Sequence, residues 1–351
     1  MTASHPAWTA DLVSRQAALA GGRSPEEVRA LLRSGTWSAL RPGQYCPTAV
    51  LGAADPGRRY HLDLLALLRQ LDRPGAVLAR STAGYLHGLL LPAPRGRQVH
   101  QLVDPGRTRH GNGYRMTRAA LPVDQVTRLG PFAVTAVART VVDCLRASWS
   151  PAASTTGDRA LVDAVALVDD ALLRGLVTVE ELHAVLRASP TSKRTPTVQR
   201  ALALADGRAE SWLESAWRVR HLTSGLVVPE LQVEIWIDGA LVKVVDGWLP
   251  EHAVAFETDG KTKYTDAYDG RSPAQVAWEE KRLEDQVRAV GIRVVRPTVT
   301  DVFGGWPALH ARVARMIAAP VPRLEAFTAV PRAAGRVRPG APRWAAYPLT
   351  T

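Results

Sequence analysis

The region that most constrains the fold lies between residues 9 and 46, where two short helix signals are followed directly by a hairpin signal. At the start of the second helix, Ser24 can serve as the N-cap and Glu27 completes a capping box. The dipeptide Pro42-Gly43 then favours a type II turn between two short apolar stretches. Two short helices followed by a hairpin is the element order of a winged helix-turn-helix, whose second helix enters the DNA major groove.

Arginines accompany this unit. Arg29 and Arg33 lie one turn apart on the second helix, away from its apolar positions, and Arg15 and Arg41 flank that helix. In a winged helix, arginines placed in this way can pair with phosphates or with guanine edges. Two alternatives remain open, namely a small helical cap with solvated arginines and a winged helix that binds protein.

The positive charge of the chain is concentrated just after this unit. The formal net charge is +11, and residues 51–150 hold fourteen Lys and Arg against six Asp and Glu. Between residues 95 and 118 only Asp104 opposes a run of basic residues, which are Arg95, Arg97, His100, Arg107, Arg109, His110, Arg115 and Arg118. On one surface these residues would neutralise phosphates of nucleic acid. Solvated loop arginines, or the docking of an acidic partner, would explain the same pattern.

Composition narrows the class of protein. Cys46 and Cys144 are the two cysteines of the chain, which argues against a disulfide framework and a cysteine zinc site and fits a reducing cytosol. No stretch approaches the roughly 20 apolar residues of a membrane span. The opening residues lack the basic and apolar regions of a signal peptide. We therefore expect a cytoplasmic protein without a membrane partner.

Hydrophobic periodicity predicts an α+β multidomain protein with domains at 1–50, 51–205 and 206–318 and a Pro/Arg-rich, irregular or wrapping tail at 319–351. In the middle region, a Ser/Thr/Pro-rich connector at 148–157 is the best internal boundary. The elements expected in the domain 51–205 are helices near 60–71, 136–147, 158–174, 179–188 and 196–205, and strands near 76–80, 98–103, 113–118 and 132–135. The elements expected in the domain 206–318 are helices at 208–222, 273–290 and 306–318, and strands at 230–237, 240–246, 253–259 and 292–296.

The sharpest chemical signal is the segment KVVDGWLPEHAVAFETDGKTKY. Asp246 ends one predicted strand, and Glu257 and Asp259 share one face of the next. Three carboxylates on neighbouring strands predict an oxygen-rich Mg²⁺ site. Lys261 or Lys263 could then orient a water or stabilise charge that develops on a phosphate.

Two further acids precede these strands. Glu210 and Glu214 would lie one turn apart on the predicted helix 208–222, where like charges repel, so a nearby cation would account for them. The structural alternative is an ion pair between Glu214 and Arg218, four residues later. For the carboxylates on the strands, the alternative is likewise a set of salt bridges, in a catalytically inactive domain that binds DNA or protein.

The N-terminal part of the chain resembles a known family. LVSRQAALAGGRSPEEVRALLRSGTWSALRPGQY resembles the N-terminal domain of AbiEi-type antitoxins of type IV toxin–antitoxin systems. The segments VLARSTAGYLHGLLLP, RMTRAALPVDQVTRLGPFAVTAVARTVVDCLR and VDDALLRGLVTVEEL follow in the order found in that family, so the resemblance covers most of residues 12–205. It implies a protein that binds its own promoter on double-stranded DNA and counters a nucleotidyltransferase-like toxin.

The C-terminal part resembles the PD-(D/E)XK nucleases, and most closely their Vsr-like members. The resemblance implies a restriction-endonuclease-like α/β fold and acidic roles for Glu214, Asp246, Glu257 and Asp259. This chain has Asp259 where the superfamily pattern has lysine, so that role would fall to Lys261 or Lys263.

Three functions follow from these features. The chain is a DNA-binding antitoxin or repressor, a Mg²⁺-dependent DNA endonuclease targeted by its winged helix, or an interaction protein whose basic surface docks a toxin.

Overall fold

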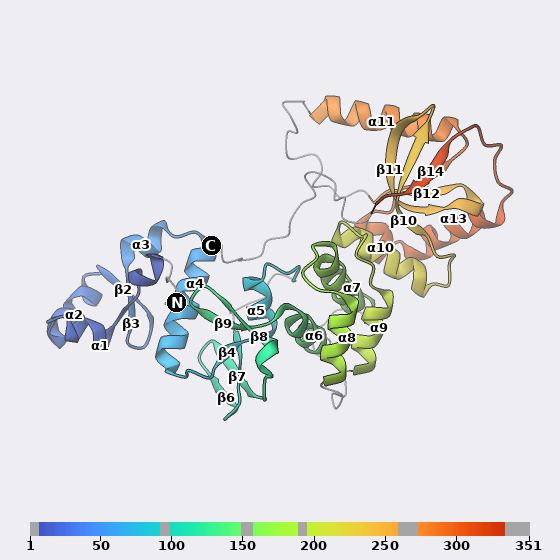
Figure 1. Ribbon diagram of the computed structural model, residues 1–351. Coiled ribbons are helices and arrows are strands. Elements are labelled where there is room, and N and C mark those ends of the chain that lie inside the picture. The colour runs from blue at the N-terminus through green and yellow to red at the C-terminus, as the bar shows by residue number, and fades with distance from the viewer. Residues whose placement is uncertain (1–6, 92–98, 149–156, 189–194, 259–272, 334–351) are drawn as a thin grey trace. The chain divides into compact units, whose positions relative to one another are not determined.

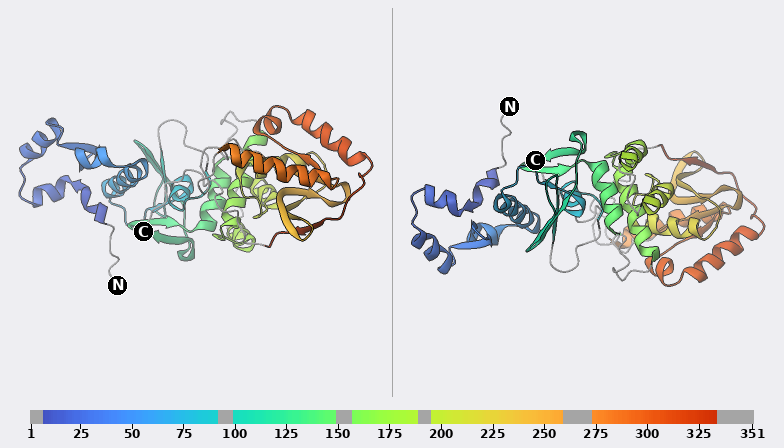
Figure 2. Two further views of the ribbon diagram at one scale, coloured as in Figure 1. Left: turned by 90° about the horizontal axis from the view of Figure 1, so that it is seen from above. Right: turned by 90° about the horizontal axis from the view of Figure 1, so that it is seen from below.

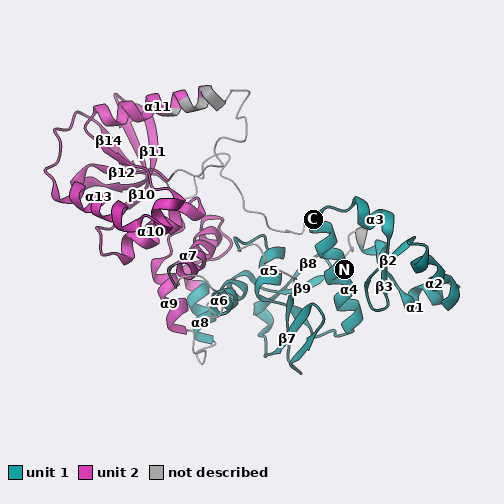
Figure 3. Ribbon diagram, turned by 180° about the vertical axis from the view of Figure 1, so that it is seen from behind, with its two compact units in different colours: residues 1–147, 181–189, 345–351 teal, residues 148–180, 190–344 magenta. Residues whose placement is uncertain are grey.

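The computed structural model describes residues 7–91, 99–148, 157–188, 195–258 and 273–333, and the chain forms two compact units (Figure 3). Of the described residues, the first unit contains those up to 147 together with 181–188. The second unit contains 157–180 and the residues from 195 onward. The chain is thus a mixed α+β protein, and residues 7–50 belong to the same compact unit as 51–147.

The first unit begins with a three-stranded antiparallel sheet in the order β1-β3-β2 (Figure 1). Its elements are the 3₁₀ helix η1 (Ala7–Asp11), β1 (Val13–Ser14), α1 (Arg15–Ala20), α2 (Pro25–Arg33), β2 (Trp37–Arg41), β3 (Gln44–Pro47) and α3 (Thr48–Ala53). The capping box of α2 is confirmed, because the Ser24 hydroxyl accepts from the Glu27 amide and the Glu27 carboxylate accepts from the Ser24 amide. Gly43 has φ +72°, as a type II turn requires at that position.

A small core holds these elements together. Ala18 of α1, Val28 of α2 and Tyr45 of β3 are buried against one another, and Trp37 stacks on Tyr45 with ring centroids 5.8 Å apart. The buried face of α2 is therefore the face that carries Val28, and the opposite face lies in solvent.

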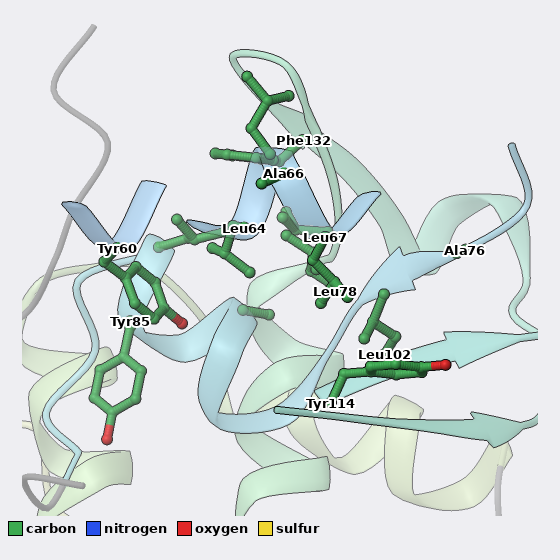
Figure 4. Close-up of a cluster of buried hydrophobic side chains, with 14 of the residues drawn as sticks. Tyr60, Leu64, Ala66, Leu67, Ala76, Leu78, Tyr85, Leu102, Tyr114 and Phe132 are labelled. Atoms are coloured by element: carbon green, nitrogen blue, oxygen red, sulfur yellow. The ribbon is translucent and has the colours of Figure 1, made fainter. Parts of the chain in front are cut away.

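A six-stranded mixed sheet in the order β6-β7-β5-β4-β9-β8 follows in the same unit. Its strands are β4 (Val77–Leu78), β5 (His100–Asp104), β6 (Arg109–Gly111), β7 (Tyr114–Arg118), β8 (Val126–Leu129) and β9 (Phe132–Thr135). The helices of this part are α4 (Pro56–Leu71), α5 (Arg80–Leu86), the 3₁₀ helix η2 (Val123–Gln125), α6 (Val137–Ser148) and α8 (Val179–Ala188). Figure 4 shows Leu64 and Leu67 of α4 packed with Leu78, Leu102 and Phe132 from the sheet.

The second unit contains a five-stranded sheet in the order β13-β12-β11-β10-β14. Its strands are β10 (Glu230–Ile237), β11 (Ala240–Leu249), β12 (Val254–Phe256), β13 (Arg293–Val295) and β14 (Thr328–Pro331). Its helices are α7 (Gly157–Leu173), α9 (Thr195–Leu204), α10 (Trp212–Thr223), the 3₁₀ helix η3 (Pro250–His252), α11 (Pro273–Ala289), α12 (Val299–Phe303) and α13 (Trp306–Ala318). Figure 2 shows α11, in orange, running across the strands.

Helices cover both faces of this sheet. Phe256 of β12 contacts Trp217 of α10, with ring centroids 4.5 Å apart. Its neighbour Ala255 is buried with Val287 of α11 in another cluster. Because successive strand residues point to opposite faces, α10 and α11 lie on opposite sides of β12. Within the second unit the order is therefore helix, three antiparallel strands, helix, and a strand parallel to β12.

The strand expected at 253–259 is shorter, because β12 begins at Val254, after Ala253 with φ +47°, and already ends at Phe256. The tail expected to be irregular or wrapping from 319 onward includes the strand β14, which pairs antiparallel with β10. Within the described part of the chain, no helix is both long enough and apolar enough to cross a membrane.

Candidate functional sites

The exposed face of α2 carries the arginines expected there. Arg29 and Arg33 of α2 are exposed, as is Arg15 of α1, whereas Val28 on the other face of α2 is 2% exposed. Arg29 lies 2.6 Å from the carboxylate of Glu26, and both side chains are mostly in solvent. Such an exposed pair contributes about 0–1 kcal/mol, so it can be exchanged for a phosphate at little cost.

Arg41 does not join this group. Its side chain is only 10% exposed, and its Nε and Nη2 donate to the two carboxylate oxygens of Asp63 at 2.9 and 2.7 Å. Its Nη1 donates to the carbonyl of Asn112 at 2.8 Å. The role expected for Arg41 in DNA binding is therefore corrected to a structural one, because its guanidinium is committed to groups of the same unit.

The basic residues between 95 and 118 likewise include both exposed side chains and a buried one. Arg107, Arg109, His110, Arg115 and Arg118 are exposed. His100, by contrast, is 1% exposed and its Nε2 lies 2.6 Å from Asp63, so its expected place on the basic surface was wrong. Arg95 and Arg97 lie outside the described residues.

Glu214 lies in the first turn of α10, in the second unit. Its amide donates to the N-cap hydroxyl of Ser211, and its Oε2 accepts from the Glu210 amide at 2.7 Å and from Gln232 Nε2 at 3.0 Å. Burial, and then the negative charge of Asp246, raise the pKa of Glu214 to about 8. A carboxyl with so high a pKa is typical of functional sites, where unlike environments separate the roles of neighbouring acids.

Asp246 lies on β11 and is 4% exposed. Its Oδ2 accepts from the Thr258 amide at 2.6 Å and from the Thr258 hydroxyl at 2.9 Å. These contacts fix the carboxylate at the end of β12, where its charge also acts on Glu214. Two of the predicted acidic residues, from a helix and a strand 32 positions apart, are thus brought together.

Glu257 has a different environment. Its Oε2 lies 2.7 Å from Lys243 Nζ and 3.4 Å from Arg296 Nη2, and Arg296 also pairs with Glu284 of α11. Lys243 was not among the predicted residues, although a lysine three positions before Asp246 was a visible signal. Asp259, Lys261 and Lys263 lie outside the described residues, so the lysine role expected for the last two stays a prediction.

Glu210 and Glu214 do not lie one turn apart on a helix, and Glu214 does not pair with Arg218, so both expectations were wrong. Glu210 precedes the N-cap of α10 rather than lying on the helix, and its carboxylate pairs with Arg332 at 3.0 Å. Arg218 pairs with Asp169 of α7 at 2.6 Å, not with Glu214. Both departures come from partners far away in the chain.

The fit to a divalent cation is partial. Among the residues that the structure describes, no group of three or more His, Cys, Asp or Glu side chains is arranged to hold a metal ion. Glu214 and Asp246 supply two neighbouring carboxylates, which is the number that protein side chains often give to Mg²⁺, with water and substrate phosphate completing its shell. Glu257 is engaged by Lys243 instead.

The comparisons with known proteins are sparse. No protein-family model matches the chain, and no curated protein matches it. Among solved structures, the crystal structure of the RV2827C protein from Mycobacterium tuberculosis aligns with a TM-score of 0.37 and 20% identity, over 64% of this chain and 84% of that one. A likeness at that level carries no inference about function.

Proposed function

We propose that this protein is a DNA-binding transcriptional regulator whose residues 7–47 act as a winged helix-turn-helix. The main support for the proposal is that α2 buries Val28 on one face and exposes Arg29 and Arg33 on the other. A helix of 9 residues is about 13.5 Å long and is accommodated by the major groove. The preceding short helix and the following hairpin β2–β3 supply the rest of the motif.

The resemblance of residues 12–205 to AbiEi-type antitoxins extends this proposal. The regulator would bind double-stranded DNA upstream of its own gene and act against a nucleotidyltransferase-like toxin. This chain's basic run, from Arg107 to Arg118, is compatible with either a nucleic acid or an acidic protein partner.

The test is a gel-shift titration of the full chain on the duplex upstream of its gene and on an unrelated duplex. We expect Arg29→Ala and Arg33→Ala each to weaken binding to the upstream duplex by about tenfold, since one good bidentate contact to a base contributes roughly 1–3 kcal/mol. The matched control is Arg128→Ala, because Arg128 is an exposed arginine of the same unit on the distant edge strand β8. Equal affinities of the α2 variants and the wild type would reject the proposal.

A second candidate function is Mg²⁺-dependent cleavage of DNA. It is favoured by the element order of the second unit, by the proximity of Glu214 on α10 to Asp246 on β11, and by the raised pKa of Glu214. Glu214 and Asp246 would hold the ion, which would polarise the scissile phosphate and activate a water. Thr258 would keep the Asp246 carboxylate in place.

Incubation of supercoiled plasmid with the protein and Mg²⁺ or Mn²⁺ tests this second function. Metal-dependent nicking by the wild type that Asp246→Asn lacks would support it. Binding of Mn²⁺ measured by calorimetry gives a readout that does not depend on turnover. If the wild-type protein neither nicks DNA nor binds Mn²⁺, the second function is rejected.

A further inference from the structure

The hairpin β2–β3 lacks the cations that a wing needs to contact the DNA backbone. Within residues 37–47 its one basic residue is Arg41. That guanidinium bonds both carboxylate oxygens of Asp63 and the carbonyl of Asn112, and 10% of the side chain is exposed. A winged helix of this chain must therefore obtain its flanking phosphate contacts elsewhere.

The bond from Arg41 identifies the neighbouring segment. Asn112 lies in the tight turn between β6 and β7, so the tip of the hairpin β2–β3 is joined to the tip of the hairpin β6–β7. Gly113 in that turn has φ +75°, and a Cβ atom there would lie 3.3 Å from Arg41 Nη2. The glycine thus lets the guanidinium lie against the turn, and the two hairpins meet in one unit.

Unlike the hairpin β2–β3, the hairpin β6–β7 exposes several cations. Arg115 lies directly opposite His110 across the hairpin, and Arg109 lies opposite Met116. Because successive strand residues point to opposite faces, Arg109 shares its face with Arg118, two residues after Met116. The exposed basic residues of the hairpin and its ends are Arg107, Arg109, His110, Arg115 and Arg118. None of these five side chains forms an ion pair with a residue that the structure describes.

Other arginines of the same unit behave differently. Arg58 pairs with Asp11 at 2.6 Å, and Arg139 pairs with Asp143 at 2.8 Å. The acid nearest in sequence to the hairpin, Asp104, is 5% exposed and accepts from the backbone amides of Gly106 and Arg107. The cations of the hairpin β6–β7 are therefore left to attract a polyanion from outside the unit.

We propose that the hairpin β6–β7, fixed to the tip of the hairpin β2–β3 by Arg41, supplies the phosphate contacts of this DNA-binding unit. This inference rests on the proposed function, because the occupant is the duplex whose major groove receives α2. Arg109 and Arg118, which share a face of the hairpin, would each neutralise a phosphate and displace condensed counterions. They would add affinity without sequence preference, whereas α2 would provide the preference.

The experiment is a fluorescence-anisotropy titration of the full chain on a labelled upstream duplex at several salt concentrations. Each lost phosphate contact lowers the steepness of the logarithmic salt dependence by about 0.9. We expect a decrease of about 0.9 for Arg109→Ala and for Arg118→Ala, and about twice that for the double variant, with a similar loss of affinity on an unrelated duplex. Arg128→Ala, at the opposite edge of the same sheet, should keep the wild-type steepness.

The outcomes separate the two proposals. A double variant with the wild-type salt dependence overturns the role of the hairpin β6–β7 and leaves its arginines as charges that protect an edge strand from pairing. If the hairpin variants lose steepness while Arg29→Ala and Arg33→Ala keep the wild-type affinity, the role of α2 is overturned and that of the hairpin stands. A wild-type protein without affinity for either duplex overturns both.

Discussion

Asp63 of α4 accepts two hydrogen bonds from the guanidinium of Arg41, at 2.9 and 2.7 Å. The same carboxylate lies 2.6 Å from Nε2 of the buried His100 on β5. Burial acts to raise the pKa of Asp63, but the hydrogen bonds of His100 and Arg41 outweigh it, and the pKa is lowered. One anion therefore joins the hairpin β2–β3 to the helix and sheet that follow it.

Replacing this anion should destabilise the first unit. In Asp63→Asn, Arg41 loses its ionic partner while its side chain stays largely buried. We expect a loss of about 1.5–3 kcal/mol in the free energy of unfolding, the usual range for hydrogen bonds to charged groups. Urea denaturation at pH 7 measures it, with Asp124→Asn as the control, since Asp124 is exposed. Equal stability of the two variants would contradict this role of Asp63.

The ion pair between Asp169 and Arg218 should be the most sensitive polar contact of the second unit. Both side chains are almost fully buried, at 1% and 5% exposed, and Asp169 also accepts from the Ser215 hydroxyl and the Asp206 amide. Asp169→Ala leaves the buried charge of Arg218 uncompensated, so we expect a loss of about 3–5 kcal/mol.

The control for that variant is Arg208→Ala. Arg208 pairs with Asp206 in the same unit, but its side chain is 45% exposed. Its removal should change the free energy of unfolding by less than about 1 kcal/mol. Similar losses for the two substitutions, measured by urea denaturation, would show that burial does not determine the strength of these pairs.

His221 should make the second unit sensitive to acid. Burial lowers the pKa of His221 to about 4, whereas histidine in an unfolded chain titrates near about 6.5. Between these values the unfolded state binds a proton that the folded state does not, so stability falls as the pH falls from about 6.5. Acidification from pH 7 to pH 5 should therefore lower the free energy of unfolding of the wild type by up to about 2 kcal/mol more than that of His221→Gln.

Unfolding by urea at the two pH values measures this difference. His110→Gln is the control, because His110 is exposed in the first unit. If His221→Gln and the wild type lose the same stability on acidification, burial of the neutral imidazole is not the cause.

Gly247 should accept no side chain. A Cβ atom at this position would lie 2.4 Å from the ring of Trp217, which is 1% exposed and packs on Phe256. We expect Gly247→Ala to cost about 1–3 kcal/mol, because an overpacked core must shift. Gly52→Ala is the control, since no atom lies within 4 Å of the added Cβ. Thermal melting that is unchanged by Gly247→Ala would contradict this packing.

Elements whose signals are local could be predicted from the sequence. The capping box of Ser24 and Glu27 starts α2, and Gly43 makes the predicted turn, because both features depend on residues within three positions. The helix expected at 306–318 is α13, with Pro307 in its first turn. The order of elements in the second unit follows from the same kind of signal.

Pairings across the chain could not be predicted. The sequence around Arg41 suggests an exposed cation. Its guanidinium is buried because it binds Asp63, which lies 22 positions later in the chain. The residues of β14 lie in a Pro-rich segment without periodicity, and their strand conformation depends on antiparallel pairing with β10. At the acidic cluster, the sequence predicted that Glu214 and Asp246 belong to one site, but not that Lys243 would engage Glu257.

DNA binding by this chain is tested most directly by the affinity of the wild-type protein for the duplex upstream of its gene, measured at several salt concentrations and compared with an unrelated duplex of equal length. We expect tighter binding to the upstream duplex, and an affinity for both that falls steeply as salt is added. No binding to either duplex at low salt, or binding that salt does not weaken, would contradict the proposal.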